Sequence, residues 1–190
     1  MKKLVLASNN KGKIKELLSL LPNGYDIVTM EEAGFTDEIE ENGKTFFDNA
    51  LIKAKTISQK LNCDAISDDS GLMVNSLFDA PGIFSARYAG EHGNDKLNRQ
   101  LLLKNLENAQ DRSARFHCCV VLYKQNGNVI FGEGETFGEI LFKEVGSNGF
   151  GYDSIFYSYD LKKSFGEATD EEKNGVSHRR RAIENLLSKL

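Results

Sequence analysis

The chain has 190 residues, which suits one substantial domain and is too short for two ordinary domains. Hydrophobic residues make up 40% and charged residues 27%, a composition that excludes a largely disordered chain. The net charge of −4 argues against a nucleic-acid polymer as partner, because such binding needs many Lys and Arg side chains, although it does not exclude a mononucleotide. No apolar run approaches the roughly 20 residues that cross a bilayer. We therefore expect one soluble domain over residues 1–190, with no membrane partner.

The three cysteines, Cys63, Cys118 and Cys119, predict free thiols instead of a disulfide framework. They cannot all pair, and Cys118 and Cys119 are neighbours on an expected strand, where adjacent side chains point to opposite faces. None has the spacing of metal ligands. Free thiols suit a reducing compartment, so we expect a cytoplasmic protein.

The N-terminal third predicts a strand, a helix, a second strand and a loop. The apolar run at residues 4–6 is typical of a strand buried on both faces. Asn10 stands where a helix N-cap would be, and residues 14–21 carry Leu and Ile at helical spacing. Residues 26–29 indicate the second strand, and the acidic residues 35–43 indicate the loop.

The middle of the chain predicts two helices with short strands between them. Residues 44–61 have an apolar stripe at helical spacing, and residues 94–106 have helical character. Residues 65–67 and 72–74 are apolar enough for strands that flank a polar turn at residues 68–71.

The C-terminal part predicts a long hairpin and a final helix. Residues 114–124 and 129–141 favour antiparallel strands, joined at residues 125–128 by a turn that contains the Asn-Gly pair. Ser177 would cap the last helix. Strands and helices that alternate early and a hairpin that follows predict an α/β fold with a mixed sheet.

The first candidate site is the strand–turn–helix segment at residues 8–13. The N-terminus of a helix offers unpaired backbone N–H groups and the positive end of the helix dipole, so it suits a phosphate. The glycine and the asparagines tolerate the backbone of a tight cradle, and a lysine adds a full charge. An ordinary strand-to-helix turn remains the alternative, since the GxxxxGK[ST] pattern is missing. The candidate phosphate-binding residues are Ser8, Asn9, Asn10, Lys11, Gly12 and Lys13.

Two acidic pairs form the second candidate site. Glu40 and Glu41 precede the predicted helix at 44–61, and Asp68 and Asp69 follow it. One or two carboxylates and the substrate's own phosphates suffice for Mg²⁺, and a carboxylate beside the metal can deprotonate a water. The glutamates could equally be a solvated charge run, whereas two adjacent acids between apolar strands are harder to explain by solvation.

An aromatic, glycine-rich segment at residues 148–153 is the third candidate. Phe150 and Tyr152 could stack on a base, with Gly151 between them, and Asp153 could accept hydrogen bonds from the base edge. Stacking discriminates weakly between bases, so hydrogen bonds would have to select among them. The alternative is a turn with two core aromatics.

Basic residues near the C-terminus form the fourth candidate. Lys173 could neutralise phosphate, and His178 and Arg179 could donate to the 6-keto oxygen of a purine. ATP would be rejected because its amino group would set donor against donor. Arg180 and Arg181 are expected to be solvated.

Seven strings in register resemble the inosine triphosphate pyrophosphatase family, most closely its bacterial dITP/XTP pyrophosphatase branch. The resemblance runs over nearly the whole chain, and its strings are LASNNKGK (6–13), EENGKTFFDNALIKA (40–54), DDSGL (68–72), APGIFSARYAG (80–90), ARFHC (114–118), GFGYD (149–153) and EKNGVSHR (172–179). The resemblance implies a two-lobed α/β fold with an elongated central mixed sheet flanked by helices. It also implies an active-site cleft between the lobes, a homodimer, and Mg²⁺-dependent hydrolysis of ITP, dITP and XTP that cleanses the nucleotide pool.

The resemblance also implies roles for the candidate residues. The segment 8–13 would hold the triphosphate, and Asp69 would be proton acceptor and metal ligand, with Glu41 or Glu40 as second ligand. The substrate contacts would then include Ser70, the base-reading residues Phe150, Gly151, Tyr152 and Asp153, the phosphate contact Lys173, and His178 with Arg179 at the keto edge. Sequence alone leaves open whether Asp68 or Asp69 and whether Glu40 or Glu41 face the metal, and it assigns Arg87 no role.

Two alternatives remain at this point. A Maf-type nucleotide pyrophosphatase would share the architecture and metal chemistry and select other bases. A non-catalytic nucleotide-binding regulator would have no need of both Asp69 and Glu41. The glutamate-rich helix signature of Nudix hydrolases is absent from the sequence.

Overall fold

The computed structural model describes residues 2–21 and 24–190, which divide into two compact units. Unit 1 comprises Met1–Asp69, Cys118–Gly134 and Arg179–Leu190, and unit 2 comprises Ser70–His117 and Glu135–His178. No helix in the described ranges is long and apolar enough to span a membrane. That the chain forms one domain over residues 1–190 stays a prediction.

A seven-stranded sheet in the order β2-β1-β3-β4-β5-β6-β7 runs through the chain. Its strands are β1 Lys2–Leu6, β2 Tyr25–Thr29, β3 Asp64–Val74, β4 Ser113–Tyr123, β5 Val129–Ile140, β6 Phe156–Ser158 and β7 Lys163–Ser164. Strand β1 pairs in parallel with β2 and β3, whereas β6 pairs antiparallel with β5 and β7. The predicted α/β class with a mixed sheet is therefore confirmed.

Strand β3 corrects one prediction. The polar turn expected at residues 68–71 is absent, since β3 runs unbroken from Asp64 to Val74. Both acidic side chains at this point are buried, and cations lie against them. Those ion pairs allow a polar segment to remain inside a buried strand, where an unpaired charge would be excluded. The predicted hairpin, by contrast, is confirmed as β4 and β5.

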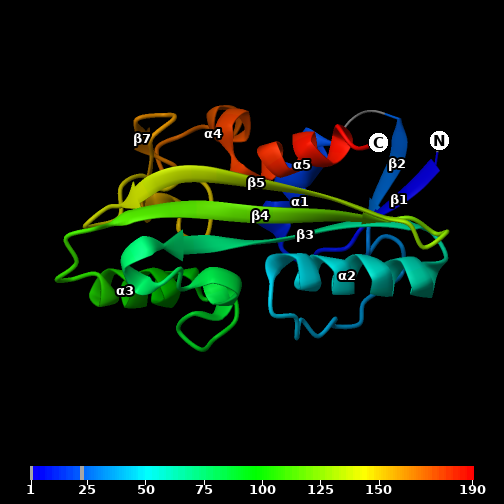
Figure 1. The fold of residues 1–190 in the computed structure, drawn as a ribbon, viewed down its shortest axis with the longest axis horizontal. Helices are drawn as coiled ribbons and strands as arrows, with labels where there is room; N and C mark the ends of the chain where they lie inside the picture. The colour runs from blue at the N-terminus through cyan, green and yellow to red at the C-terminus, as the bar shows by residue number, and fades with distance from the viewer. Residues whose placement is uncertain (1, 22–23) are drawn as a thin grey trace. The chain divides into compact units, whose positions relative to one another are not determined.

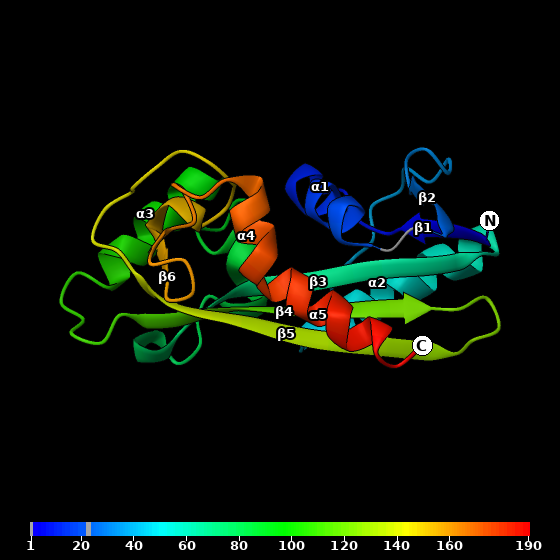
Figure 2. The ribbon, with the colours of Figure 1, turned by 90° about the horizontal axis from the view of Figure 1, so that it is seen from above.

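Three helices cover the sheet within unit 1. They are α1 Lys11–Leu20, α2 Phe46–Leu61 and α5 His178–Leu187, and Figure 1 shows α2 on one face and α1 with α5 on the other. Figure 2 looks down on α1 and α5 from above. Two separate apolar clusters match these faces, because neighbouring residues of a strand point to opposite sides. Leu4 and Leu6 pack with the side of α1 and α5, and Val5 and Ala7 pack with Ile57 of α2.

The helix starts follow from local capping. Asn10 accepts from the Lys13 N–H at 3.0 Å and caps α1 as predicted. Thr45 and Asp48 form a capping box that begins α2 at Phe46, two residues after the predicted start. Both caps set the first turn of a helix beside residues of the candidate site.

Unit 2 has its own core and its own two helices, α3 Asp95–Asn105 and α4 Asp170–Val176. Aromatic rings fill its centre: Phe156 lies 4.6 Å from Phe116 and 5.1 Å from Phe165, centroid to centroid. Short 3₁₀ segments at Asn75–Leu77, Gly82–Arg87 and Asp153–Ile155 connect the longer elements. The sequence analysis did not predict α4, β6 or β7, because elements this short show too little periodicity.

Candidate functional site

The segment that leads from β1 into α1 has the geometry of an anion-binding turn. Ser8 is nearly buried and accepts from the Asn10 N–H at 3.3 Å, whereas Asn9 and Lys11 are exposed. The N-cap side chain satisfies one of the free N–H groups of the first turn, and the others remain suited to a phosphate. Lys13 points from this turn into the acidic cluster of unit 1.

Asp69 lies at the centre of that cluster. Its Oδ1 is 3.7 Å from Lys53 Nζ and 3.9 Å from Lys13 Nζ, and its Oδ2 accepts from Asn49 Nδ2 at 3.2 Å. The Asn49 amide is itself oriented, because its Oδ1 accepts from the Gly43 N–H at 2.9 Å. Two cations and one amide therefore hold a nearly buried carboxylate in a defined position.

The two neighbouring glutamates differ in position. Glu41 Oε2 accepts from Lys53 Nζ at 2.9 Å, and its side chain is 30% exposed. Glu40 is exposed to solvent. Because Lys53 contacts both Glu41 and Asp69, Glu41 is the glutamate that the fold brings toward Asp69.

Asp68 belongs to a second ion-pair network, which shares Lys13 with the Asp69 cluster. Its Oδ2 is 3.1 Å from both Nε and Nη2 of Arg179 and 3.4 Å from Lys13 Nζ. Arg179 Nη1 also donates to Glu16 on α1. Arg179 is 1% exposed, and its guanidinium bonds the two carboxylates Asp68 and Glu16. Its predicted contact with a purine edge stays a prediction.

The pKa values of the two adjacent aspartates are shifted in opposite directions. Burial raises the pKa of Asp68, but the charges of Lys13 and Arg179 outweigh it and hold that pKa well below its ordinary value. Burial also raises the pKa of Asp69, and there the charges of Lys13 and Lys53 do not cancel the effect. Burial lowers the pKa of Lys53, yet Asp69 and Glu41 raise it above its ordinary value. Asp68 is thus held as a permanent anion, whereas Asp69 is the better proton acceptor.

Unit 2 holds the predicted base-reading loop. Asp153 is buried, and its Oδ2 accepts from the Phe150 N–H at 2.8 Å and from Lys173 Nζ at 2.6 Å. The same ammonium lies 4.6 Å from the centre of the Phe150 ring. Gly149 has φ +75°, and a Cβ there would collide with the Asp153 carboxylate, so glycine is required at that position.

The loop offers one aromatic face instead of the expected two. Tyr152 is 5% exposed within the core of unit 2, and its hydroxyl donates to the Ser85 carbonyl at 2.8 Å. Phe150 keeps a partly exposed ring. The expected pair of stacking aromatics is corrected for this reason, and only Phe150 is placed for such a contact.

The remaining predicted residues lie as follows. Lys173 is buried in the Asp153–Phe150 cluster of unit 2, and its predicted phosphate contact stays a prediction. His178 is also buried and stacks on Phe116 at 4.9 Å between centroids. Ser70 follows Asp69 on β3 and is half-buried. Arg180 is exposed and pairs with a glutamate one turn away, as expected for a solvated position.

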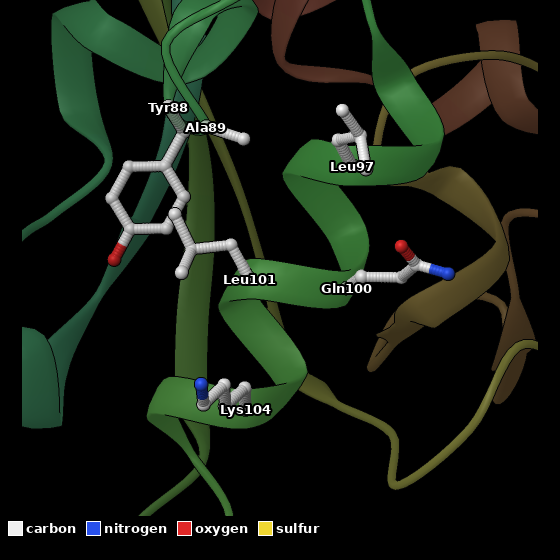
Figure 3. Close-up of a pocket in the computed structure, with 6 residues that line it drawn as sticks. All are labelled: Tyr88, Ala89, Leu97, Gln100, Leu101 and Lys104. Atoms are coloured by element: carbon white, nitrogen blue, oxygen red, sulfur yellow. The ribbon is translucent and has the colours of Figure 1, made fainter.

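Helix α3 borders two pockets of unit 2. One, of about 490 Å³, is lined by Asp95, Lys96 and Arg99 of α3 and, on the base-reading side, by Glu144, residues 146–151 and Ser154. The other, of about 460 Å³, is shown in Figure 3 and is lined by Tyr88, Ala89, Leu97, Gln100, Leu101 and Lys104. The two sets of α3 residues lie on different faces of the helix, as 3.6 residues per turn requires.

Three residues of the unit 1 clusters were missed in the sequence. Asn49 and Lys53 are buried on α2 and reach Asp69, although they read as polar positions beside an apolar stripe. Their spacing of four residues is the signal, because it places both on one face of the helix. Glu16 gave no comparable signal. Arg87 lies 5.2 Å from the Phe84 ring centre and still has no assigned role.

These features define a class of α/β protein. Its members have a mixed sheet, a helix N-terminus suited to an anion and a buried carboxylate between two lysines. The chain belongs to the Ham1 family, whose model matches residues 4–189, and the resemblance found in the sequence is confirmed.

The relatives and solved structures below match along nearly their whole length. A dITP/XTP pyrophosphatase from Clostridium perfringens is 45% identical over 100% of this chain and 98% of that protein. The structure of the Ham1 protein from Staphylococcus aureus has a TM-score of 0.89 at 40% identity, covering 99% of this chain and 97% of that one. A nucleoside-triphosphatase, dITP/XTP pyrophosphatase, from Mycobacterium abscessus has a TM-score of 0.79 at 39% identity, with 97% and 98% covered.

Proposed function

We propose that this protein is a nucleoside-triphosphate pyrophosphatase that hydrolyses ITP, dITP and XTP to the monophosphate and pyrophosphate. The observation that carries the proposal is Asp69, a nearly buried carboxylate that lies against the ammonium groups of Lys13 and Lys53. A positioned base and fixed positive charge are what attack of water on a triphosphate requires. The names of the relatives from C. perfringens and M. abscessus support the substrate class. The activity would remove deaminated purines from the nucleotide pool.

The chain's own residues divide the work. Asp69 accepts the proton of the attacking water, and its raised pKa makes it a stronger base than an ordinary carboxylate. Lys13 and Lys53 offset the charge of the triphosphate, whose oxygens also lie at the start of α1. Attack at the α-phosphorus then releases pyrophosphate.

Recognition of the base is assigned to unit 2 and to the residues where α5 begins. Phe150 packs on the ring, Asp153 and Lys173 fix the loop that carries it, and His178 donates to the 6-keto oxygen. Arg179 would share this role only by releasing one of its carboxylate partners. An amino group at this position of the ring would face donors and lose their hydrogen bonds, which disfavours ATP.

Magnesium is part of the proposal, and Glu41 and Asp69 would hold it. The ammonium of Lys53 already lies between these two carboxylates, so the site accepts positive charge. Within residues 2–21 and 24–190 no group of three or more His, Cys, Asp or Glu side chains is placed for a metal, which suits an ion that takes its other ligands from water and phosphate. Bound Mg²⁺ would supply charge neutralisation on the triphosphate and a polarised water.

Glu41→Gln is expected to raise the Mg²⁺ concentration needed for half-maximal activity by at least about tenfold, because one anionic ligand is lost. The measurement is a Mg²⁺ titration of ITP hydrolysis. Glu40→Gln is the matched control, since Glu40 is exposed and should leave the titration unchanged. A larger effect from Glu40→Gln would show that Glu40, and not Glu41, is the metal ligand.

The substrate class is tested by pyrophosphate release from ITP, XTP, GTP, ATP, dUTP, UTP, CTP and dTTP in the presence of Mg²⁺. We expect kcat/KM for ITP and XTP to exceed that for ATP by at least about a hundredfold, because the keto edge is read by hydrogen bonds. A preference for pyrimidine nucleotides would favour a Maf-type enzyme. Nucleotide binding without turnover would favour a regulator.

We also propose a homodimer in the cytoplasm. The location is supported by three free cysteines, all of them buried thiols. The dimer is supported by the family resemblance and by large exposed apolar side chains on unit 2, among them Phe78, Phe84 and Phe142.

A further inference from the structure

Two side chains of α3 hold the backbone of a single glycine in the base-reading loop. The Gly151 N–H donates to Asp95 Oδ2 at 2.8 Å, and the Gly151 carbonyl accepts from Arg99 Nη1 at 2.8 Å. Asp95 and Arg99 are four residues apart and therefore lie on one face of the helix. Gly151 has φ +60°, in the region that favours glycine.

Holding both polar groups of one glycine fixes its two backbone dihedrals. Glycine has more conformational freedom than any other residue, so an unheld glycine at this position would let the loop move on either side of it. The two bonds connect the peptide units before and after the Gly151 Cα to one rigid helix. The clamp of Asp95 and Arg99 thus acts at the residue of the loop that has the greatest conformational freedom.

The clamp is itself supported. Arg99 Nε forms an ion pair with Glu144 Oε1 at 3.2 Å, and Glu144 Oε2 accepts from Ser154 Oγ at 3.1 Å. The Arg99 side chain is only 17% exposed, so its guanidinium is confined between Glu144 and the Gly151 carbonyl. Asp95 is in the first turn of α3, where the helix dipole favours a carboxylate.

The residue before Gly151 is the one that would pack on the base, and the residue after it anchors the loop. Phe150 precedes Gly151, and Tyr152 follows it with its hydroxyl bonded to the Ser85 carbonyl. Asp153 accepts from the Phe150 N–H and from Lys173, so a change at Gly151 would move the ring and the charged pair together.

We propose that Asp95 and Arg99 are positioning residues that set the discrimination between 6-keto and 6-amino purines by holding Gly151. They act through the loop, by hydrogen bonds to the Gly151 backbone. The inference rests on the proposed function, in which this loop packs on the base. Rejection by unmatched donors requires a loop that cannot adjust to the wrong base, so loosening it should weaken rejection of ATP.

The test uses the full-length protein with Asp95→Ala and Arg99→Ala. Asp95→Asn is the conservative variant, because its Oδ1 can still accept from the Gly151 N–H. Gln100→Ala is the matched control, since Gln100 lies on the same helix, is exposed and lines the other pocket (Figure 3). Amide hydrogen exchange of residues 149–154 and kcat/KM for ITP and ATP are measured for each variant.

We expect faster exchange in residues 149–154 and an ITP-to-ATP ratio of kcat/KM that falls by at least about tenfold in both alanine variants, with kcat for ITP changed less than about threefold. Asp95→Asn should restore most of the ratio, and Gln100→Ala should match the wild type. A merely structural brace would reduce the active fraction for both nucleotides equally and leave the ratio unchanged.

Each contrary outcome has one meaning. Exchange that stays at the wild-type rate shows that the two side chains do not hold the loop, and the inference is overturned. Faster exchange with an unchanged ratio overturns the specificity role while the proposed function stands. Wild-type protein that fails to cleave ITP overturns the proposed function and the specificity role, whereas the exchange data still decide whether the clamp exists.

Discussion

Asp69→Asn is expected to lower kcat for ITP by about 10²–10⁴-fold, because the amide cannot accept the proton of the attacking water. The substitution keeps the shape of the side chain and leaves Asn49, Lys13 and Lys53 in place around it. Binding of ITP at saturating Mg²⁺ should survive, since Glu41 remains as a metal ligand and removing one negative charge does not weaken attraction of the triphosphate. The measurements are steady-state pyrophosphate release and equilibrium binding of ITP.

The neighbouring residue Ser70 and the thermal stability of the variant provide the control. Asp69 is nearly buried and asparagine keeps its shape, so the midpoint of unfolding shows whether a loss of turnover reflects a loss of folded protein. Ser70→Ala, at a predicted substrate contact, should change KM for ITP more than kcat, because the hydroxyl has no part in accepting the proton. Turnover by Asp69→Asn within about tenfold of the wild type would remove Asp69 from the role of base.

Asp68→Ala is expected to destabilise the protein by about 3–5 kcal/mol, because it leaves a buried guanidinium without its partner. Asp68 has no exposed surface, and Arg179 has only 1%. The variant would also deprive Lys13 of its nearer carboxylate. Urea unfolding at neutral pH measures the loss, and a change below about 1 kcal/mol would contradict a structural role for this pair.

The dependence on pH gives an independent check of the same ion pair. The folded protein holds the pKa of Asp68 well below its ordinary value, despite burial that raises it, because of Lys13 and Arg179. Stability from this group is therefore complete above the pKa of the unfolded chain and is lost as the pH falls through the lower folded pKa. The difference in unfolding free energy between wild type and Asp68→Asn should narrow below about pH 4. A difference that stays constant down to pH 2 would show that the charge of Asp68 is not the source of the stability that the variant loses.

Local sequence predicted most of the fold where an element has strong periodicity or a clear cap. Asn10, the stripe along α2 and the Asn-Gly turn between β4 and β5 each carry their signal within a few residues. The residues 68–71 carried the wrong signal, since four polar or small residues in a row favour a turn. They stay in β3 because cations from other elements neutralise the two acids.

The candidate site was predictable in part for the same reason. Lys13 and Asp69 lie in short sequence motifs, and the residue types within each motif are enough to predict a phosphate contact or a carboxylate base. The network of Glu16, Asp68 and Arg179 joins positions up to 163 residues apart, so no local pattern can announce it. Tyr152 shows the converse, because an aromatic between glycines looks accessible in sequence and only packing against the core of unit 2 reveals its burial.

The most direct test identifies the products when purified protein and Mg²⁺ act on ITP in water enriched in ¹⁸O. Phosphorus NMR should show IMP and pyrophosphate, with the label in IMP, because water attacks the α-phosphorus. IDP and inorganic phosphate, or equal cleavage of ATP under the same conditions, would contradict the proposed pyrophosphatase.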